Sequence, residues 1–304
     1  MSLGGTPLHV TAADTTQKIR IGFPSLAFSY MPFYVAREKG FLRRHNLEGE
    51  YIQMRTPIQP QAVVAGNINY FTSVSTGISA AVAGLPLVIV LNLCDGSPWT
   101  LVTNSEINKP QDLIGKTVAI SGIRTSPWYM LQAFLKKYEI PEKDVSMITT
   151  GGTSDSFLAL TTNRVAGTVL TPPFDDKAVS LGYKKFMFLG DLAPIPYVGL
   201  VASQAEAKNS RETVRRTLEA VFDSVAWIRA NRAESVRMIV EKFKVNQTEA
   251  DNTYAMLMKL LNKDGRLNPK TARGYLDLLR QERPIPADFD MQKVLDFSML
   301  PGAR

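Results

Sequence analysis

The sequence predicts an α/β fold in which mainly parallel sheets, spread over two domains, are followed by a helical C-terminal part. Its 304 residues correspond to two domains at about 150 residues per domain. Short β-branched runs alternate with amphipathic stretches, which is the pattern of βαβ units. From Ala205 onward, apolar residues recur at helical spacing throughout.

The first series of elements begins with a predicted strand at 18–23 and a predicted helix at 33–39. Pro32 stands where a first helical turn tolerates proline, and Gly40 ends the helix. The alternation continues in the same way, with strands at 51–55, 70–74 and 87–93 and helices at 59–65 and 77–83. This order predicts a sheet whose strands are joined by helical crossovers.

A second series follows the extended segment 100–103 and predicts another compact α/β module. Its strands are expected at 116–121, 145–149, 165–170 and 185–189, and its helices at 126–138, 155–162 and 173–181. An extended segment at 197–203 then leads into the helical part. There, helices are predicted at 214–228, 236–243, 248–261 and 269–281, with apolar faces that pack on the core.

The residue types present argue against several common chemistries. With Cys94 as its one cysteine, the chain forms no internal disulfide, and with two histidines it lacks the ligands of a zinc cluster. A Ser-His-Asp arrangement would have to use His9 or His45. Residues 113–117 end as a phosphate-binding loop does, but Pro110 replaces the required glycine, and no dinucleotide-binding glycine motif occurs.

The net charge of +7 is spread along the chain. Residues 1–103 carry 7 basic and 5 acidic side chains, residues 104–194 carry 10 and 9, and residues 195–304 carry 18 and 14. The densest basic cluster, around Arg215, lies among glutamates, which is typical of a solvated helix face. Nucleic acid is therefore not an expected partner, because nucleic-acid binders concentrate basic residues on one face. The longest nearly unbroken apolar run, 85–94, is too short to span a bilayer.

Hydroxyl and aromatic side chains follow successive predicted strands, where open α/β sheets place their ligands. The candidate ligand-binding residues in these loops are Ser25, Phe28, Tyr30, Ser75, Thr76, Asp95, Trp99, Ser121, Arg124, Thr125, Ser126, Thr153 and Asp155. Segment 121–126 precedes a helix, so its backbone N–H groups with Arg124 could cradle an anion. An ordinary serine cap beside a solvent-facing arginine explains the same residues. Asp95 and Asp191 could instead pair with a cationic or amine-bearing ligand.

Four spaced segments resemble a known family. Residues 31–41 resemble the signature P-x-Y-V-A-x-E-x-G-F of substrate-binding proteins of ABC importers, in the thiamine-precursor, sulfonate and nitrate group (NMT1/THI5-like). Residues 62–69 resemble the A-L-x-A-G-x-I-D helix, residues 84–88 the G-x-P-L-x-V strand entry, and residues 110–120 the P-x-D-L-x-G-K-x-V-A segment. The resemblance covers about residues 18–240.

The resemblance implies a periplasmic-binding-protein fold of type II, with two α/β lobes that close on a ligand about a hinge. Residues 18–102 plus 197–304 would form one lobe and 103–196 the other, with hinges at 99–104 and 191–197. Aromatic side chains could stack on a planar ligand while hydroxyls orient it. Pro172 and Tyr197 join Asp191 and the loop residues above as candidate ligand-binding residues, and Trp128 joins the candidate stacking aromatics.

The function implied by the resemblance is capture of a small organic ligand and delivery to a membrane ABC permease. An anionic sulfonate or carboxylate is expected ahead of a pyrimidine, and the protein is expected to be a monomer without cofactor, metal or catalytic activity. A pyrimidine synthase of fungal thiamine biosynthesis resembles the same family, but it carries a cysteine-rich motif where this chain has only Cys94. The effector half of a transcription regulator would need an N-terminal helix-turn-helix, for which residues 1–17 are too short.

The N-terminal residues 1–17 are polar and are expected to be disordered. Residues 1–5, Met-Ser-Leu-Gly-Gly, look like a cloning scar joined to a trimmed chain. No signal peptide is evident. Because the start looks trimmed and the resemblance is to periplasmic proteins, we expect a periplasmic protein whose signal peptide was removed, or an extracellular protein anchored to the membrane.

Overall fold

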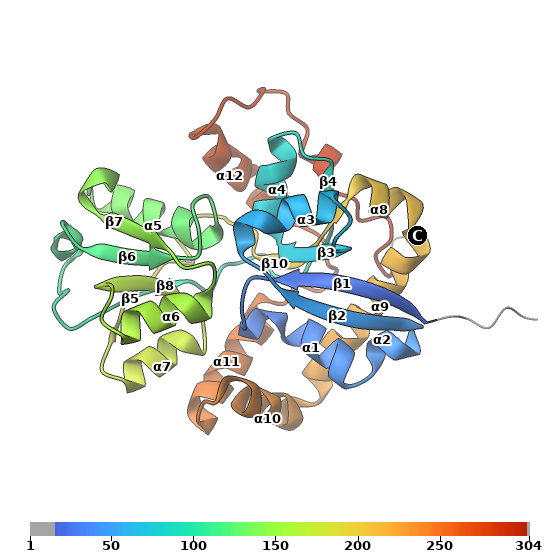
Figure 1. The fold of residues 1–304 in the computed structure, drawn as a ribbon, viewed down its shortest axis with the longest axis horizontal. Coiled ribbons are helices and arrows are strands. Elements are labelled where there is room, and N and C mark those ends of the chain that lie inside the picture. The colour runs from blue at the N-terminus through green and yellow to red at the C-terminus, as the bar shows by residue number, and fades with distance from the viewer. Residues whose placement is uncertain (1–15, 303–304) are drawn as a thin grey trace, which may run out of the picture.

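The structure, a computed structural model, describes residues 16–302 and contains two five-stranded sheets that lie side by side (Figure 1). Residues 1–15, most of the segment that is expected to be disordered, lie outside the described residues. The expectation is wrong at Gln17, which begins the first strand and pairs with Leu47. We refer to each sheet with the helices packed on it as the first and the second lobe.

The first lobe is built on a mixed sheet that is mostly parallel. Its strand order is β2 (Leu47–Gln53), β1 (Gln17–Phe23), β3 (Tyr70–Ser73), β10 (Val198–Ser203) and β4 (Leu87–Asn92). Strands β1, β2 and β3 run parallel, whereas β10 is antiparallel to both of its neighbours. Strand β10 returns from the second lobe, which is why it enters the sheet in the opposite direction.

The second lobe repeats this plan. Its strand order is β7 (Ser146–Thr149), β6 (Thr117–Ile120), β8 (Gly167–Leu170), β5 (Thr100–Thr103) and β9 (Lys184–Phe188). Strand β5, which arrives from the first lobe, is antiparallel to both β8 and β9. The predicted fold class is therefore confirmed, with one antiparallel strand in each sheet. The exact division of the chain at residues 102/103 and 196/197 stays a prediction.

Helices cover both sheets. The first lobe carries α1 (Met31–Glu38), α2 (Phe41–Arg44), α3 (Gln59–Val64), α4 (Val74–Val82), α8 (Gln204–Asn209), α9 (Arg211–Ala230), α10 (Arg232–Phe243), α11 (Gln247–Leu260) and α12 (Pro269–Arg280). The second lobe carries α5 (Ser126–Lys137), α6 (Thr153–Thr161) and α7 (Phe174–Ser180). Each helix that the periodicity predicts is present, and the short helices α2 and α8 were not assigned because four and six residues are too few to show a period.

Strand β2 begins four residues earlier than predicted. Its first residues, Leu47-Glu48-Gly49-Glu50, look polar in the sequence, yet Leu47 is fully buried and the segment pairs with β1 along its whole length. Polar side chains are tolerated here because β2 is an edge strand with one face toward solvent. Tertiary pairing therefore overrides the local composition.

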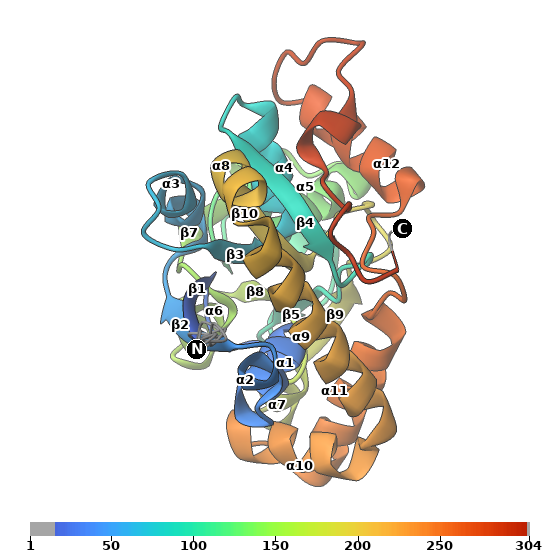
Figure 2. The ribbon, with the colours of Figure 1, turned by 90° about the vertical axis from the view of Figure 1, so that its right-hand side faces the viewer.

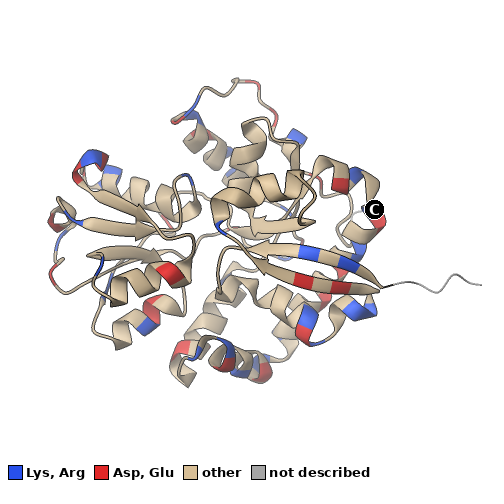
Figure 3. Ribbon diagram, viewed as in Figure 1, with Lys and Arg blue, Asp and Glu red and all other residues tan. Residues whose placement is uncertain are grey.

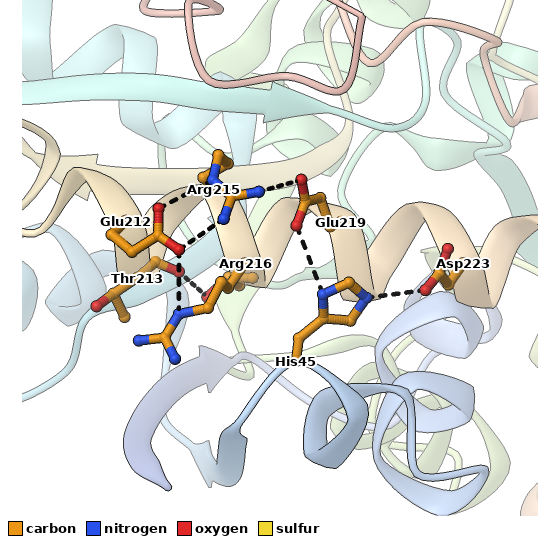
Figure 4. Close-up of polar contacts among 8 residues, drawn as sticks. His45, Glu212, Thr213, Arg215, Arg216, Glu219 and Asp223 are labelled. Atoms are coloured by element: carbon orange, nitrogen blue, oxygen red, sulfur yellow. Dashed lines mark hydrogen bonds and ion pairs between the residues drawn. The ribbon is translucent and has the colours of Figure 1, made fainter. Parts of the chain in front are cut away.

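Helix α9 is the longest helix described and runs diagonally across the first lobe (Figure 2). Its buried stripe includes Val214, Leu218 and Val221, and it packs against α1 and α2. Its polar face carries a chain of ion pairs that ends on the loop after α2, where His45 Nε2 lies 2.8 Å from Asp223 and His45 Nδ1 lies 3.5 Å from Glu219 (Figure 4). Arg215, paired with Glu212 and Glu219, thus lies on the solvated, acid-paired face that the sequence predicts, whereas the Arg216 side chain is largely buried.

The last described residues return along the first lobe. Leu295 forms a bridge with Ile89 of β4, and Val294 and Leu300 are buried. Among residues 16–302, no helix combines the length and the apolar character that crossing a bilayer requires.

Gly199 of β10 provides a test of the packing within the sheet of the first lobe. A Cβ atom at this position would overlap the carbonyl oxygen of Leu91 and meet the side chain of Val74. Because β10 is held between two strands, we expect Gly199→Ala to lower the free energy of unfolding by about 1–3 kcal/mol. Urea denaturation followed by circular dichroism measures this, and an unchanged midpoint would contradict the packing described here.

Candidate functional site

A small enclosed cavity lies between the two lobes, where several strands end and helices begin. Its volume is about 30 Å³, enough for a water-sized group. The first lobe contributes Pro24, Tyr30, Thr56, Ser73, Tyr197 and Val198, the second lobe contributes Ser121, Thr125, Ser126, Pro127, Gly152 and Thr153, and the connection between them contributes Trp99. We refer to this space as the cleft cavity.

The lining of the cleft cavity is polar but uncharged. Eight of its thirteen residues carry a hydroxyl group, and none carries a charge. The indole Nε1 of Trp99 is buried and has no hydrogen-bond acceptor in the described part of the chain. The charged residues lie mainly on the outer helices and loops, and the ribbon at the junction of the lobes is largely free of them (Figure 3). The cavity therefore offers hydrogen-bond donors rather than a counter-ion.

Three helices begin at the cleft cavity. Ser73, Thr125 and Gly152 precede α4, α5 and α6, and in none of these helices does the residue before the first turn accept a backbone N–H with its side chain. Helices α8, α11 and α12 are capped in this way by Ser203, Asn246 and Asn268, whereas the remaining described α-helices also lack a side-chain cap. At the cleft, the first N–H groups of α4 and α6 donate to Tyr197 O and Ser25 Oγ. The first N–H groups of a helix have no acceptor within it, and their partial positive charge attracts anions.

The two lobes touch each other directly around the cavity. The backbone N–H of Thr153 donates to Ser25 Oγ at 3.0 Å, and the hydroxyls of Ser75 and Ser126 lie 2.7 Å apart. At the rim, Glu282 from the end of α12 accepts from Tyr129 at 3.2 Å and lies 3.4 Å from Arg124 Nε. The structure is therefore a closed arrangement, in which a larger ligand would require the lobes to separate.

Two buried tyrosines complete the polar lining. Burial raises the pKa of Tyr197 and of Tyr30 above the usual range, so both phenols keep their protons at physiological pH. Ser29 donates to the Tyr197 hydroxyl at 3.3 Å, and the Trp99 ring meets Tyr197 edge to face at 5.5 Å. Both tyrosines can therefore donate a hydrogen bond to a ligand that accepts one.

Ten of the sixteen predicted ligand-binding residues lie in or directly behind this site. The seven that line the cavity are Tyr30, Trp99, Ser121, Thr125, Ser126, Thr153 and Tyr197. Three more do not line the cavity but hydrogen-bond to residues that do: Ser25 to Thr153, Ser75 to Ser126 and Thr76 to Ser73. The part that these residues play in binding stays a prediction.

The other six predicted residues do not line the cavity. Phe28 and Pro172 are buried, and Asp155 and Asp191 are exposed. Asp95 accepts from Asn92 and from the backbone N–H of Asn268, and burial raises the pKa of its carboxyl. Arg124, expected to hold an anion, has a side chain that is 59% exposed and pairs with Glu282. The Arg124 side chain therefore does not line the cavity.

Six lining residues are not among the predicted ligand-binding residues: Pro24, Thr56, Ser73, Pro127, Gly152 and Val198. Thr56 follows β2 and Ser73 ends β3, so position at the end of a strand was a usable signal for both. Gly152 and Val198 contribute backbone and a small apolar surface, for which the sequence has no marker. Arg55 was also missed: it lies at the rim, with Cγ 2.9 Å from the position that a Cβ of Gly151 would occupy.

Metal-ligating side chains are dispersed in the described residues. Within residues 16–302, no three or more His, Cys, Asp or Glu side chains are grouped so that they could hold a metal ion. Cys94 is fully buried, and burial raises the pKa of its thiol well above the usual range.

Two sheets of mixed direction, two connections between the lobes and an enclosed polar cavity at their junction define a two-lobed solute-binding fold. The chain belongs to the NMT1/THI5-like family, which residues 27–235 match. No curated protein sequence matches the chain.

Solved structures of the same architecture are numerous. The chain is similar to a protein from Bordetella bronchiseptica RB50, with a TM-score of 0.75, 20% identity and 94% of each chain covered. It is similar to the alkanesulfonate-binding protein SsuA from Xanthomonas axonopodis pv. citri, bound to MOPS, with a TM-score of 0.76, 16% identity and coverage of 93% of this chain and 99% of that one. It is also similar to the periplasmic nitrate-binding protein NrtA from Synechocystis PCC 6803, with a TM-score of 0.73, 15% identity and coverage of 94% and 87%.

A substitution at Gly152 tests whether the two lobes must approach each other as closely as they do in this structure. A Cβ atom at this position would lie 2.6 Å from Ser25 Cβ and 2.9 Å from the carbonyl oxygen of Pro24, both in the opposite lobe. Gly152→Ala should therefore hold the lobes apart, raise the radius of gyration in small-angle scattering and leave each lobe folded. As a matched control, Gly96→Ala meets only a Leu260 side chain. The same scattering curve for both variants would contradict this role of Gly152.

Proposed function

We propose that this protein is the solute-binding receptor of an ABC importer and captures a small organic anion, a sulfonate or a carboxylate, between its lobes. One observation carries the proposal. Three helices that lack a side-chain cap, α4, α5 and α6, begin at a cavity that is rich in hydroxyl groups and has no charged side chain, and the first N–H groups of α4 and α6 donate to Tyr197 O and Ser25 Oγ. Such a site suits an oxyanion, because helix N-termini and neutral donors stabilise negative charge.

The donors and the family support an anion over an amine or a cation. An amine would need carboxylates, but the predicted Asp95 and Asp191 do not line the cavity. Trp99 Nε1 and the tyrosine hydroxyls can donate to sulfonate or carboxylate oxygens, as can lining hydroxyls other than those of Ser73 and Thr125, which already donate to Thr76 and to the backbone of Gly122. The names of SsuA and NrtA identify sulfonate and nitrate as the ligands of those similar proteins.

The proposed mechanism is differential binding to two states. Residues from both lobes contact the ligand only when the lobes are closed, so the ligand shifts the equilibrium toward the closed form by its difference in affinity. The cleft cavity as it stands has room for a water-sized group only, so a sulfonate or carboxylate ligand needs a wider cleft. The closed form would then dock on a membrane permease, which places the protein in the periplasm or on the outer face of the membrane.

A pyrimidine or thiamine precursor is the second candidate. The rings of Tyr30 and Trp99 at the cavity favour it, because both could contact a planar ligand. A pyrimidine synthase activity is tested separately, by incubation with iron, pyridoxal phosphate and oxygen and a search for a pyrimidine product.

A thermal-shift screen identifies the ligand class. The panel contains alkanesulfonates, nitrate, aliphatic and aromatic carboxylates, pyrimidines and flavins. A ligand at 100 times its Kd adds about 2.7 kcal/mol to the free energy of unfolding, which is a readily measured shift. We expect sulfonates or carboxylates to raise the melting temperature. A shift with pyrimidines alone would overturn the anion proposal.

A substitution of Trp99 tests whether the cavity binds the anion through hydrogen-bond donors. Trp99→Phe keeps an aromatic ring but removes the buried N–H, so affinity for the anion should fall about tenfold, the loss of one hydrogen bond to a charged group. Trp227→Phe is the matched control, since Trp227 lies on α9 away from the cavity. Isothermal titration calorimetry with the ligand from the screen measures both variants. Equal affinity in Trp99→Phe and the wild type would show that this N–H does not reach the ligand.

A further inference from the structure

A second, larger groove lies on the outside of the molecule between α5 of the second lobe and α12 of the first. Its volume is about 610 Å³, within the range of small-molecule sites. It shares no lining residue with the cleft cavity. The buried rings of Tyr129 and Tyr275 meet edge to face at 5.6 Å, and Tyr275 donates to the backbone of Ser75 behind the cavity. This tyrosine pair lies between the two spaces.

One wall of the groove presents two unused hydrogen-bond donors. Trp128 Nε1 and Gln132 Nε2 are buried and have no acceptor in the described part of the chain. They are four residues apart on α5, so they lie one above the other on the same face of the helix. A buried donor without an acceptor is costly, and an acceptor supplied by a ligand removes that cost.

The charged side chains of the groove that have no ion-pair partner in the described residues favour a ligand with an anionic group. The carboxylates of Asp277 and Glu282 already pair with arginines. Lys136, one turn beyond Gln132, has a long contact of 3.5 Å with Gln281, and Lys137 lies over the Tyr138 ring; neither has a carboxylate partner in the described residues. Glu142 is the remaining acid of the lining.

The opposite wall is mixed, with an apolar part beside Asp277, Gln281 and Glu282. Leu192, Ala193 and Pro194 belong to the connection that returns to the first lobe, and Leu278 projects from α12. A ligand with a flat apolar body and a carboxylate at one edge would match both walls, with the body on the aliphatic side and the carboxylate at the row of donors on α5.

We propose that the groove between α5 and α12 is a second binding site, for a small aromatic carboxylate held by Trp128 Nε1, Gln132 Nε2 and the charge of Lys136. Because the two walls belong to different lobes, the site is complete only when the lobes are closed. An occupant therefore stabilises the closed form from outside, independently of which ligand occupies the cleft cavity.

The probe for this site is 1-naphthoate, titrated into the full chain by calorimetry. We expect one binding event that Trp128→Phe and Gln132→Glu each weaken about tenfold, the first by removing a donor and the second by adding a negative charge. Trp227→Phe is the control for loss of an indole. Thermal unfolding of each variant checks that it is folded, and the two substitutions act on different side chains, so failure of one to fold leaves the other decisive.

Three outcomes would overturn the proposal. The first is no binding of 1-naphthoate at millimolar concentration. The second is binding that Trp99→Phe weakens and Trp128→Phe does not, which would place the probe in the cleft cavity. The third concerns closure: Gly152→Ala, which should hold the lobes apart, is expected to weaken 1-naphthoate binding as well. Unchanged affinity in that variant would show that the groove does not require the closed form.

Discussion

Backbone N–H groups at the start of α4, α5 and α6 have no acceptor within their own helices, and the site depends on this constraint. A side chain at the helix start satisfies such a group in α8, α11 and α12, as Asn246 does for α11, whereas the other described α-helices have no side-chain cap. At the cleft, the first N–H groups of α4 and α6 donate to Tyr197 O and Ser25 Oγ, and all three helix starts line the cavity between the lobes. A hydrogen-bond donor in a closed, uncharged cavity is energetically costly while it has no acceptor, and an oxyanion can supply that acceptor.

The topology explains why these helix starts meet. In a parallel sheet, every helix that follows a strand begins at the same edge, so each lobe collects several helix N-termini on one side. Strands β5 and β10 cross between the lobes, and each enters its new sheet antiparallel to its neighbours. This pairing turns the two sheet edges at which the helices begin toward each other. Close contacts at Gly152 and between Ser75 and Ser126 then bring them within hydrogen-bonding distance.

The outer groove follows from the same arrangement. Helix α5 starts at the cleft and runs outward, so its first turn faces the cavity while Trp128, Gln132 and Lys136 lie along the groove wall. Helix α12 reaches the same place from the C-terminal part of the chain, and Glu282 at its end contacts Tyr129 and Arg124 across the lobes. One element of the second lobe thus contributes to both spaces, and both spaces depend on closure.

The sequence by itself determined the order of strands and helices and the loops that bear the site, because hydrophobic period and glycine or proline punctuation are local properties. It also placed hydroxyls such as Ser126 and Thr153 after strands, where parallel sheets bind ligands. Only the tertiary structure decided which polar residues reach the cavity. Arg124 and Asp95 looked like charge partners for a ligand, but contacts with Glu282 and Asn268, 158 and 173 residues away in the sequence, hold them elsewhere. The partners of a charged side chain depend on packing between distant segments, which no local pattern records.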